Sequence, residues 1–154
     1  MKKLHSRKKL FKGRTSGRLS AVQALFQIEQ TGNTASEVVL EFMSYRLIDT
    51  ENGLPKSDTS FFTKLVEGAW RIHEHSDETI RGALKSGWSI DRIEPVTRAI
   101  LRAALYELSE TQTPSAVIID EYLNITRDFF NDVEVSFVNG ILNTIMQKIR
   151  PALS

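Results

Sequence analysis

Cysteine is absent from the 154-residue chain. Its absence excludes disulfide bonds, thiolate nucleophiles and zinc sites built on cysteine, and it fits a reducing compartment. No apolar run approaches the roughly 18–20 residues that cross a bilayer, and no apolar segment follows the basic N-terminus as a secretory signal requires. We therefore expect a cytoplasmic protein without membrane association. An organellar transit peptide is an alternative interpretation of the N-terminal segment.

Sequence motifs of common enzymes and metal sites are also missing. There is no Gly-x-Gly-x-x-Gly loop, no Walker-type phosphate loop and no His-Glu-x-x-His motif. His73 and His75 are two residues apart, so on a helix they point to different sides and form a poor metal pair. The adjacent acids Asp77–Glu78 and Asp120–Glu121 diverge in the same way, whereas acid–base catalysis needs convergent groups. We predict no catalytic activity, no cofactor and no metal site.

Acidic residues are absent from residues 1–18, which carry eight Lys or Arg side chains. The other 136 residues carry 12 basic and 19 acidic side chains, so a net charge of +1 combines a segment of +8 with a remainder of −7. Like charges repel, and Gly13 and Gly17 oppose an early helix. We predict a flexible basic arm over residues 1–15 and a single domain over residues 16–154.

The charge and aromatic content of this arm favour nucleic-acid binding. Arginine and lysine pair with phosphate oxygens, and aromatic rings stack on unpaired bases. The arm contains Phe11, and Arg14 and Arg18 are one helical turn apart, so both can point the same way from the start of the first helix. A solubilising tail and a targeting segment are the alternatives, and charge alone does not distinguish RNA from DNA.

Apolar residues recur at helical spacing along most of the chain, and no alternating run predicts a strand. We predict an all-α fold of about seven helices. They are expected near residues 17–31, 35–47, 58–72, 76–86, 95–108, 114–129 and 132–149. The polar loop at residues 50–57, which contains Gly53 and Pro55, is interpreted as the boundary between two packed sub-bundles.

The helix predicted at residues 95–108 is the most apolar of the set. Pro95 suits a first helical turn, and Arg98 and Arg102 are expected to keep one strip of the helix in solvent. The remaining surface carries a broad apolar stripe formed by Ile100, Leu101, Ala104, Leu105 and Leu108. We predict that the other helices pack around this one.

The last helix contains Asn139 and Gly140 in its middle, where glycine costs about 1 kcal/mol relative to alanine. For Gly140 we favour close packing against the central helix. Asn139 has two equal interpretations, a hydrogen bond to nearby backbone or an outward-facing ligand position.

Four stretches of the chain, taken together, resemble the NusB family of transcription antitermination factors. They are Ala21-Val-Gln-Ala-Leu-Phe26, Ala99-Ile-Leu-Arg-Ala-Ala-Leu-Tyr-Glu-Leu108, Val117-Ile-Ile-Asp-Glu121 and Phe137-Val-Asn-Gly-Ile-Leu142. Their order and spacing match the family over about residues 14–149. The resemblance implies an all-α bundle of two packed sub-bundles that binds RNA and catalyses no reaction.

The resemblance also implies partners and RNA contacts. NusB proteins bind boxA, a single-stranded element of nascent ribosomal RNA transcripts, together with NusE, a small-subunit ribosomal protein. They act in the bacterial cytoplasm with NusA, NusG and RNA polymerase. The basic RNA-binding segment of the family matches Arg14 and Arg18, extended here by Lys8, Lys9 and Lys12. RNA contacts from the last helix are implied for Ser136, Phe137 and Asn139.

Two positions are implied in NusE binding, Phe26 and Thr97. The family usually has Tyr at the first and commonly Glu at the second, so this chain lacks that hydroxyl and that carboxylate. Two alternatives to the antitermination role remain. NusB-like domains also occur fused to RNA cytosine methyltransferases, so the chain could be an accessory module of an RNA-modifying enzyme, or it could act as a homodimer.

Overall fold

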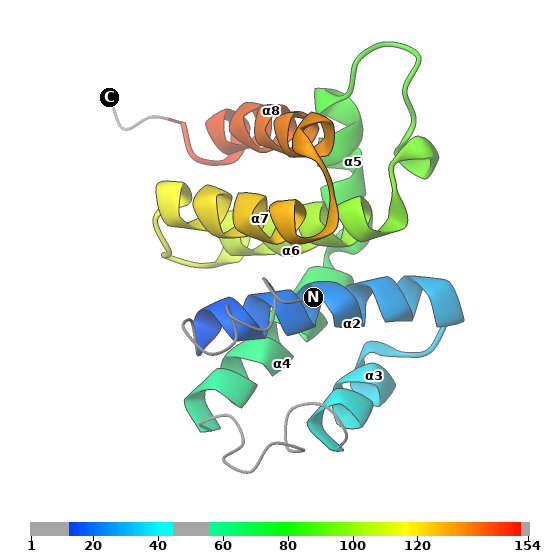
Figure 1. The fold of residues 1–154 in the computed structure, drawn as a ribbon, viewed down its shortest axis with the longest axis vertical. Helices are drawn as coiled ribbons and strands as arrows, with labels where there is room; N and C mark the ends of the chain where they lie inside the picture. The colour runs from blue at the N-terminus through cyan, green and yellow to red at the C-terminus, as the bar shows by residue number, and fades with distance from the viewer. Residues whose placement is uncertain (1–12, 45–55, 152–154) are drawn as a thin grey trace.

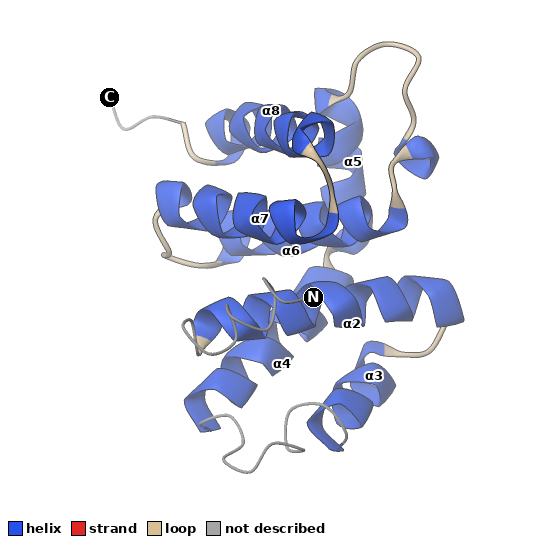
Figure 2. Cartoon of the chain, in the orientation of Figure 1, coloured by secondary structure: helices blue, strands red, loops and turns tan. Residues whose placement is uncertain are grey.

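The computed structural model describes residues 13–44 and 56–151. Lys8, Lys9 and Lys12, which are predicted to bind RNA, lie outside the described residues. Within these ranges the chain is helical and contains no strand (Figure 2), which confirms the all-α prediction. The described elements are α2 (Arg14–Thr31), α3 (Ala35–Phe42), α4 (Lys56–Arg71), α5 (His73–Ala83), the 3-10 helix η2 (Ile90–Arg92), α6 (Pro95–Glu110), α7 (Ser115–Phe129) and α8 (Asp132–Ile149).

The helices form two groups that share α6 (Figure 1). Helices α2, α3 and α4 pack on one another, and α5, α7 and α8 pack with α6. The two groups join where α2 and α4 lie against α6. The chain passes from one group to the other at Ile72, between α4 and α5, and the predicted boundary at residues 50–57 is wrong. It is wrong because α4, which follows that loop, places its apolar face on α2 and α3.

Several helix termini follow the sequence signals. Thr34 and Glu37 form a capping box, in which each side chain accepts a hydrogen bond from the other residue's backbone N–H. Gly32 ends α2 with a φ of 77°, a left-handed conformation that favours glycine. Pro95 lies in the first turn of α6, as predicted. Residues at or next to these three termini therefore determine where the helices begin or end.

Other termini differ from the predictions. Helix α2 begins at Arg14, after Gly13 with a φ of 82°, and Ser16 lies inside the helix and does not cap it. Arg14 and Thr15 thus belong to the folded body and not to the arm. Helix α8, in contrast, begins where its predicted range begins, and its cap is Asn131, whose Oδ1 accepts from the N–H of Val133 at 3.2 Å.

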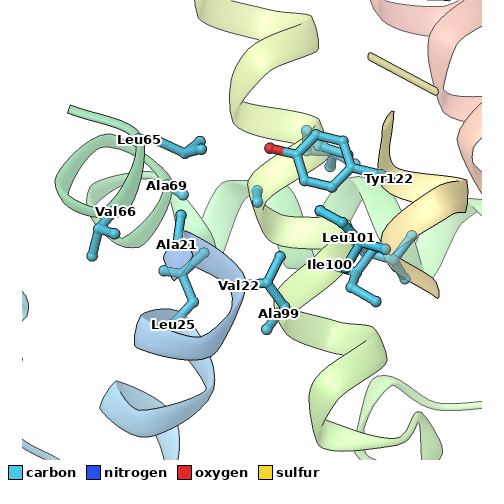
Figure 3. Close-up of a cluster of buried hydrophobic side chains, with 14 of the residues drawn as sticks. Ala21, Val22, Leu25, Leu65, Val66, Ala69, Ala99, Ile100, Leu101 and Tyr122 are labelled. Carbon is cyan, nitrogen blue, oxygen red and sulfur yellow. The ribbon is translucent and has the colours of Figure 1, made fainter. Parts of the chain in front are cut away.

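The core is centred on α6, as predicted. Ten of its 16 residues are buried, and the small residues Ala99 and Ala103 allow neighbouring helices to approach closely. Figure 3 shows the side chains that meet there, from α2 (Ala21, Val22, Leu25), α4 (Leu65, Val66, Ala69), α6 (Ala99, Ile100, Leu101) and α7 (Tyr122). Apolar burial on several sides of one helix therefore joins the two groups.

Two glycines have opposite surroundings. A Cβ placed on Gly68 of α4 would lie 2.1 Å from Cε1 of Tyr106, so the tyrosine ring of α6 rests directly on this glycine. A Cβ on Gly140 would meet no atom within 4 Å, and Gly140 is exposed. The predicted packing of Gly140 against the central helix is therefore wrong, because this residue faces solvent.

The arginines of α6 do not form a solvated strip as predicted. The Nε and Nη2 atoms of Arg102 donate to Asp77 of α5 at 2.9 and 2.8 Å, and Nη1 donates to Glu29 of α2 at 2.7 Å. Nη2 of Arg98 also donates to Glu29, at 2.7 Å. Arg102 is buried and Arg98 is partly buried. These ion pairs connect α2 and α5 to α6.

Glu29 makes the stability of this ion cluster depend on pH. Burial alone would raise the pKa of Glu29, but the hydrogen bonds and charges of Arg98 and Arg102 outweigh it and hold the pKa below its ordinary value of 4.5. A carboxyl group whose pKa is lowered on folding stabilises the protein fully above its unfolded pKa. That stabilisation is lost as the pH falls through the lower, folded pKa.

We expect Glu29→Gln to remove part of the acid sensitivity of folding. The free energy of unfolding, measured by urea titration between pH 7 and pH 3, should fall less steeply below about pH 4.5 in the variant than in the wild type. Glu78→Gln, at an exposed acid of α5, is the matched control. Identical pH profiles for Glu29→Gln and the wild type would contradict this role.

Candidate nucleic-acid and partner surfaces

Arg14 lies exposed at the start of α2, where the basic N-terminal segment joins the folded body. Its guanidinium carbon is 4.7 Å from the centre of the Phe61 ring on α4. This ring is itself packed closely on Gly17, where a Cβ would lie 3.1 Å from Phe61 Cδ2. The aromatic contact orients the cation and leaves it open to solvent. Arg14 can therefore bind a phosphate group.

Arg18 approaches the same Phe61 ring as Arg14, with its guanidinium carbon 5.2 Å from the ring centre, but the rest of its environment is different. Arg18 is only 4% exposed. Its Nε and Nη2 atoms donate to Glu107 of α6 at 2.7 and 2.9 Å, and Nη1 donates to Glu121 of α7 at 3.2 Å. In this arrangement the guanidinium faces the interior. Arg18 links α2 to α6 and α7, and its predicted RNA contact has no support from this geometry.

Glu107 is the centre of this buried cluster. Its side chain is fully buried, and it accepts a third hydrogen bond from the hydroxyl of Tyr122 at 2.6 Å. Burial, and then the charge and hydrogen bond of Glu107, raise the pKa of Tyr122 well above its usual value. Burial alone would lower the pKa of Arg18, but its hydrogen bond and charge pairing with Glu107 raise it. The cluster thus holds Arg18 in its charged form.

A pocket of about 220 Å³ opens beside Arg14 between α4 and α6. It combines two cationic side chains with two aromatic rings. Its walls include Arg14, Phe61, Lys64, Tyr106, Thr111 and Thr113. Cations next to aromatic faces are the side chains that single-stranded nucleic acids contact. The surface around Arg14 is therefore chemically suited to RNA.

The predicted RNA residues of α8 lie elsewhere. Ser136 and Asn139 are exposed, and Asn143 Nδ2 donates to both the backbone O and Oδ1 of Asn139 at 2.8 Å. Phe137 is partly buried, with its ring centre 6.1 Å from that of Trp88. Helices α6 and α7 lie between α8 and α2 (Figure 1), so the structure does not bring these residues together with Arg14.

Phe26 lines an open groove of about 370 Å³ between α2 and the facing ends of α6 and α7. The groove is largely apolar, and its other walls are Val22, Gln23, Gln27, Gln30, Thr31, Val96 and Phe129. Phe129 is 39% exposed, and Val133 at the start of α8 is 76% exposed. Partly exposed aromatic and apolar side chains around a groove are typical of a protein-binding surface.

Thr97 is fully buried and cannot itself contact a partner. Its hydroxyl donates to Glu134 Oε2 of α8 at 2.5 Å. Position 97 of α6 is not an acid in this chain. A carboxylate nevertheless lies at this place in the fold, because Glu134 of α8 supplies it. The prediction that Thr97 contacts a partner is therefore corrected: Thr97 is buried and positions the side chain of Glu134.

The described residues form neither a metal-binding cluster nor a membrane-spanning helix. Among residues 13–44 and 56–151, no three His, Asp or Glu side chains lie close enough to hold a metal ion. His73 instead stacks on Trp70 at 3.8 Å between ring centres, and His75 is exposed. None of the described helices has the length and hydropathy needed to cross a membrane.

Comparison with known proteins gives consistent matches over nearly the whole chain. The NusB family profile matches residues 15–147. The transcription antitermination protein NusB of Gluconobacter oxydans is 39% identical over 142 residues, which cover 89% of this chain and 88% of that protein. The protein of the same name from Sinorhizobium fredii is 42% identical over 141 residues, with the same coverage of both chains.

Solved structures agree in fold. NusB of T. maritima superposes with a TM-score of 0.78 at 28% identity, covering 90% of this chain and 93% of that chain. The crystal structure of antitermination factors NusB and NusE in complex with dsRNA contains a chain that superposes with a TM-score of 0.76 at 26% identity. It covers 88% of this chain and 96% of that chain.

Proposed function

The chain belongs to the NusB family, and on that premise we propose that it is an RNA-binding transcription antitermination protein. It would recognise boxA-type single-stranded RNA in nascent ribosomal RNA transcripts together with NusE. The observation that carries the proposal is the match, in fold and over nearly the full chain, to a chain of the crystal structure of NusB and NusE in complex with dsRNA. The family consists of RNA-binding factors and not of enzymes, so the protein acts by binding.

RNA binding is proposed to start at Arg14 and to continue along the basic N-terminal segment through Lys8, Lys9 and Lys12. Exposure of Arg14 at the junction and the six Lys and Arg residues among residues 1–12 support this path. Ser136, Phe137 and Asn139 are proposed as a second contact, on α8. Arg18 is proposed as an internal anchor, because its guanidinium is already paired with Glu107.

NusE is proposed to bind at the groove lined by Phe26, with Glu134 supplying a carboxylate nearby. The apolar lining of the groove and the exposure of Phe129 and Val133 support this placement. NusA, NusG and RNA polymerase would be further members of the antitermination complex. Because such a complex forms on nascent transcripts, the proposed place of action is the bacterial cytoplasm.

Binding of a fluorescent boxA-like RNA, measured with and without NusE at several salt concentrations, tests the proposal. We expect tighter binding to the boxA-like strand than to a scrambled strand or a duplex, and further tightening by NusE. Arg14→Ala should weaken binding and reduce the salt slope by about 0.7, the value for one phosphate contact on a single strand. Phe26→Ala should remove the NusE effect and leave the salt slope unchanged.

Arg71→Ala is the matched control, because Arg71 is exposed and, among the described residues, makes a long 3.7 Å ion pair with Glu110 and no other ion pair. It should change neither the affinity nor the salt slope. Equal affinity for the boxA-like and scrambled strands, unaffected by NusE, would overturn the antitermination role. Sedimentation of the same samples shows whether the groove instead pairs two copies of the chain.

A further inference from the structure

Trp88 is a large aromatic side chain that the fold leaves half in solvent. It lies between α5 and η2 and is 51% exposed. The other tryptophan of the chain, Trp70, is partly buried and stacks on His73. Trp88 contacts Phe137 at 6.1 Å between ring centres with an interplanar angle of 38°. This tilted contact supports the indole ring and leaves much of its surface open.

The turn that carries Trp88 is ordered by its own hydrogen bonds. The N–H of Trp88 donates to the carbonyl of Lys85 at 3.0 Å. Gly87 has a φ of 89°, which favours glycine, and its carbonyl accepts from Arg92 Nη1 at 3.4 Å. These hydrogen bonds hold the indole in a defined position, so Trp88 is exposed within an ordered turn.

The surroundings of Trp88 are basic. Arg81, Lys85 and Arg92 are exposed on the same segment, and Asp91 is the one acid between residues 81 and 92. Lys148 of α8 reaches this segment, with Nζ 3.5 Å from the carbonyl of Gly82. The body as a whole carries a net negative charge, so this cluster of cations around an open aromatic face is a local exception.

We propose that Trp88 is a stacking face for an unpaired RNA base, with Lys85 and Arg92 binding the flanking phosphates. Proteins that bind single strands combine stacked aromatic side chains with cations along the backbone path. Phe137 holds the indole from behind, so the site joins the outward face of α8 to the turn before η2. The inference rests on the proposed RNA-binding function and adds a site that lies apart from the basic N-terminal segment.

Tryptophan fluorescence tests the stacking directly. In a Trp70→Phe protein, Trp88 is the one remaining tryptophan, and titration with boxA-like single-stranded RNA should quench its emission. Trp88→Ala should weaken RNA binding by roughly 5- to 150-fold, because stacking contributes about 1–3 kcal/mol per base. The slope of log affinity against log salt should stay unchanged, since no charge is removed. Trp88→Phe, which keeps an aromatic face, should retain most of the affinity.

Charge variants separate stacking from phosphate binding. Lys85→Ala and Arg92→Ala should each reduce the salt slope by about 0.7 and leave the quenching in place at saturating RNA. Leu40→Ala removes another exposed apolar side chain, 67% exposed on α3, and should change nothing. Thermal unfolding of each variant checks that the fold is intact.

The outcomes distinguish this inference from the proposed function. If the wild type binds boxA-like RNA, and Trp88→Ala and Trp88→Phe bind it equally well without quenching of Trp88, the stacking site is overturned and the antitermination role stands. If the wild type binds no RNA, both are overturned. A Trp88→Ala protein that binds RNA normally but loses the NusE effect would assign this face to a protein partner and would also overturn the inference.

Discussion

Replacing Glu107 with alanine is expected to lower the free energy of unfolding by about 3–5 kcal/mol, the usual effect of removing one partner from a buried ion pair. The Glu107 carboxylate is fully buried and accepts two hydrogen bonds from Arg18 and one from Tyr122. Its loss leaves a buried guanidinium that keeps its 3.2 Å contact to Glu121 and its contact with the Phe61 ring but loses its paired carboxylate. It also leaves the buried Tyr122 hydroxyl without this acceptor. Urea unfolding at pH 7 measures the change.

Two further variants show whether burial is the cause. Glu110→Ala breaks the exposed pair with Arg71 and should change stability by at most about 0.5 kcal/mol. The double variant Arg18→Met with Glu107→Leu should be more stable than Glu107→Ala, because apolar side chains of similar size can replace a buried pair with little loss. A Glu107→Ala protein as stable as Glu110→Ala would show that this cluster does not hold α2 to α6 and α7.

Gly68→Ala is expected to destabilise the protein by about 1–3 kcal/mol, although alanine is the better helix former. The added Cβ would lie 2.1 Å from Cε1 and 2.5 Å from Cζ of Tyr106, so either the ring or helix α4 must move. The displaced contact belongs to the interface between α4 and α6, which joins the two groups of helices.

Gly140→Ala is the matched comparison, because it makes the same chemical change inside a helix. Its Cβ meets no atom within 4 Å, so the intrinsic preference for alanine should stabilise the protein by up to about 1 kcal/mol. In urea unfolding, the free energy of unfolding should fall for Gly68→Ala and rise for Gly140→Ala. If both variants were stabilised, the ring of Tyr106 would not depend on the glycine beneath it.

The fold was predictable where local chemistry determines it. Helical spacing of apolar residues predicted the all-α class and the central position of α6, and the capping box at Thr34 and Glu37 fixed the start of α3. The boundary between the two groups was not predictable from composition. The polar loop at residues 50–57 has the features of a boundary, whereas the actual crossing at Ile72 lies between two helices and depends on which faces pack together.

The candidate site was predictable only in part, because charge in a sequence does not show where a side chain is buried. Arg14 and Arg18 are equivalent by spacing, but one is exposed and the other is enclosed by carboxylates from α6 and α7. Arg102 was likewise expected in solvent and forms a buried pair with Asp77. A usable signal was Glu107, an acid between Leu105 and Leu108 in an apolar stripe, which requires a buried cation as its partner.

The position of α6 bears on how sequences of this fold diverge. A helix that touches neighbours on most sides accepts few substitutions, because each change must fit several surfaces at once. The stretch Ala99–Leu108, one of the four that carry the resemblance, is therefore constrained by packing and not by recognition. The exposed residues that are proposed to contact RNA, such as Arg14 and Trp88, pack against fewer neighbours, so packing constrains them less. Phe26 and Phe137 belong both to stretches that carry the resemblance and to the proposed contact surfaces, whereas the stretch in α6 carries the resemblance through packing alone.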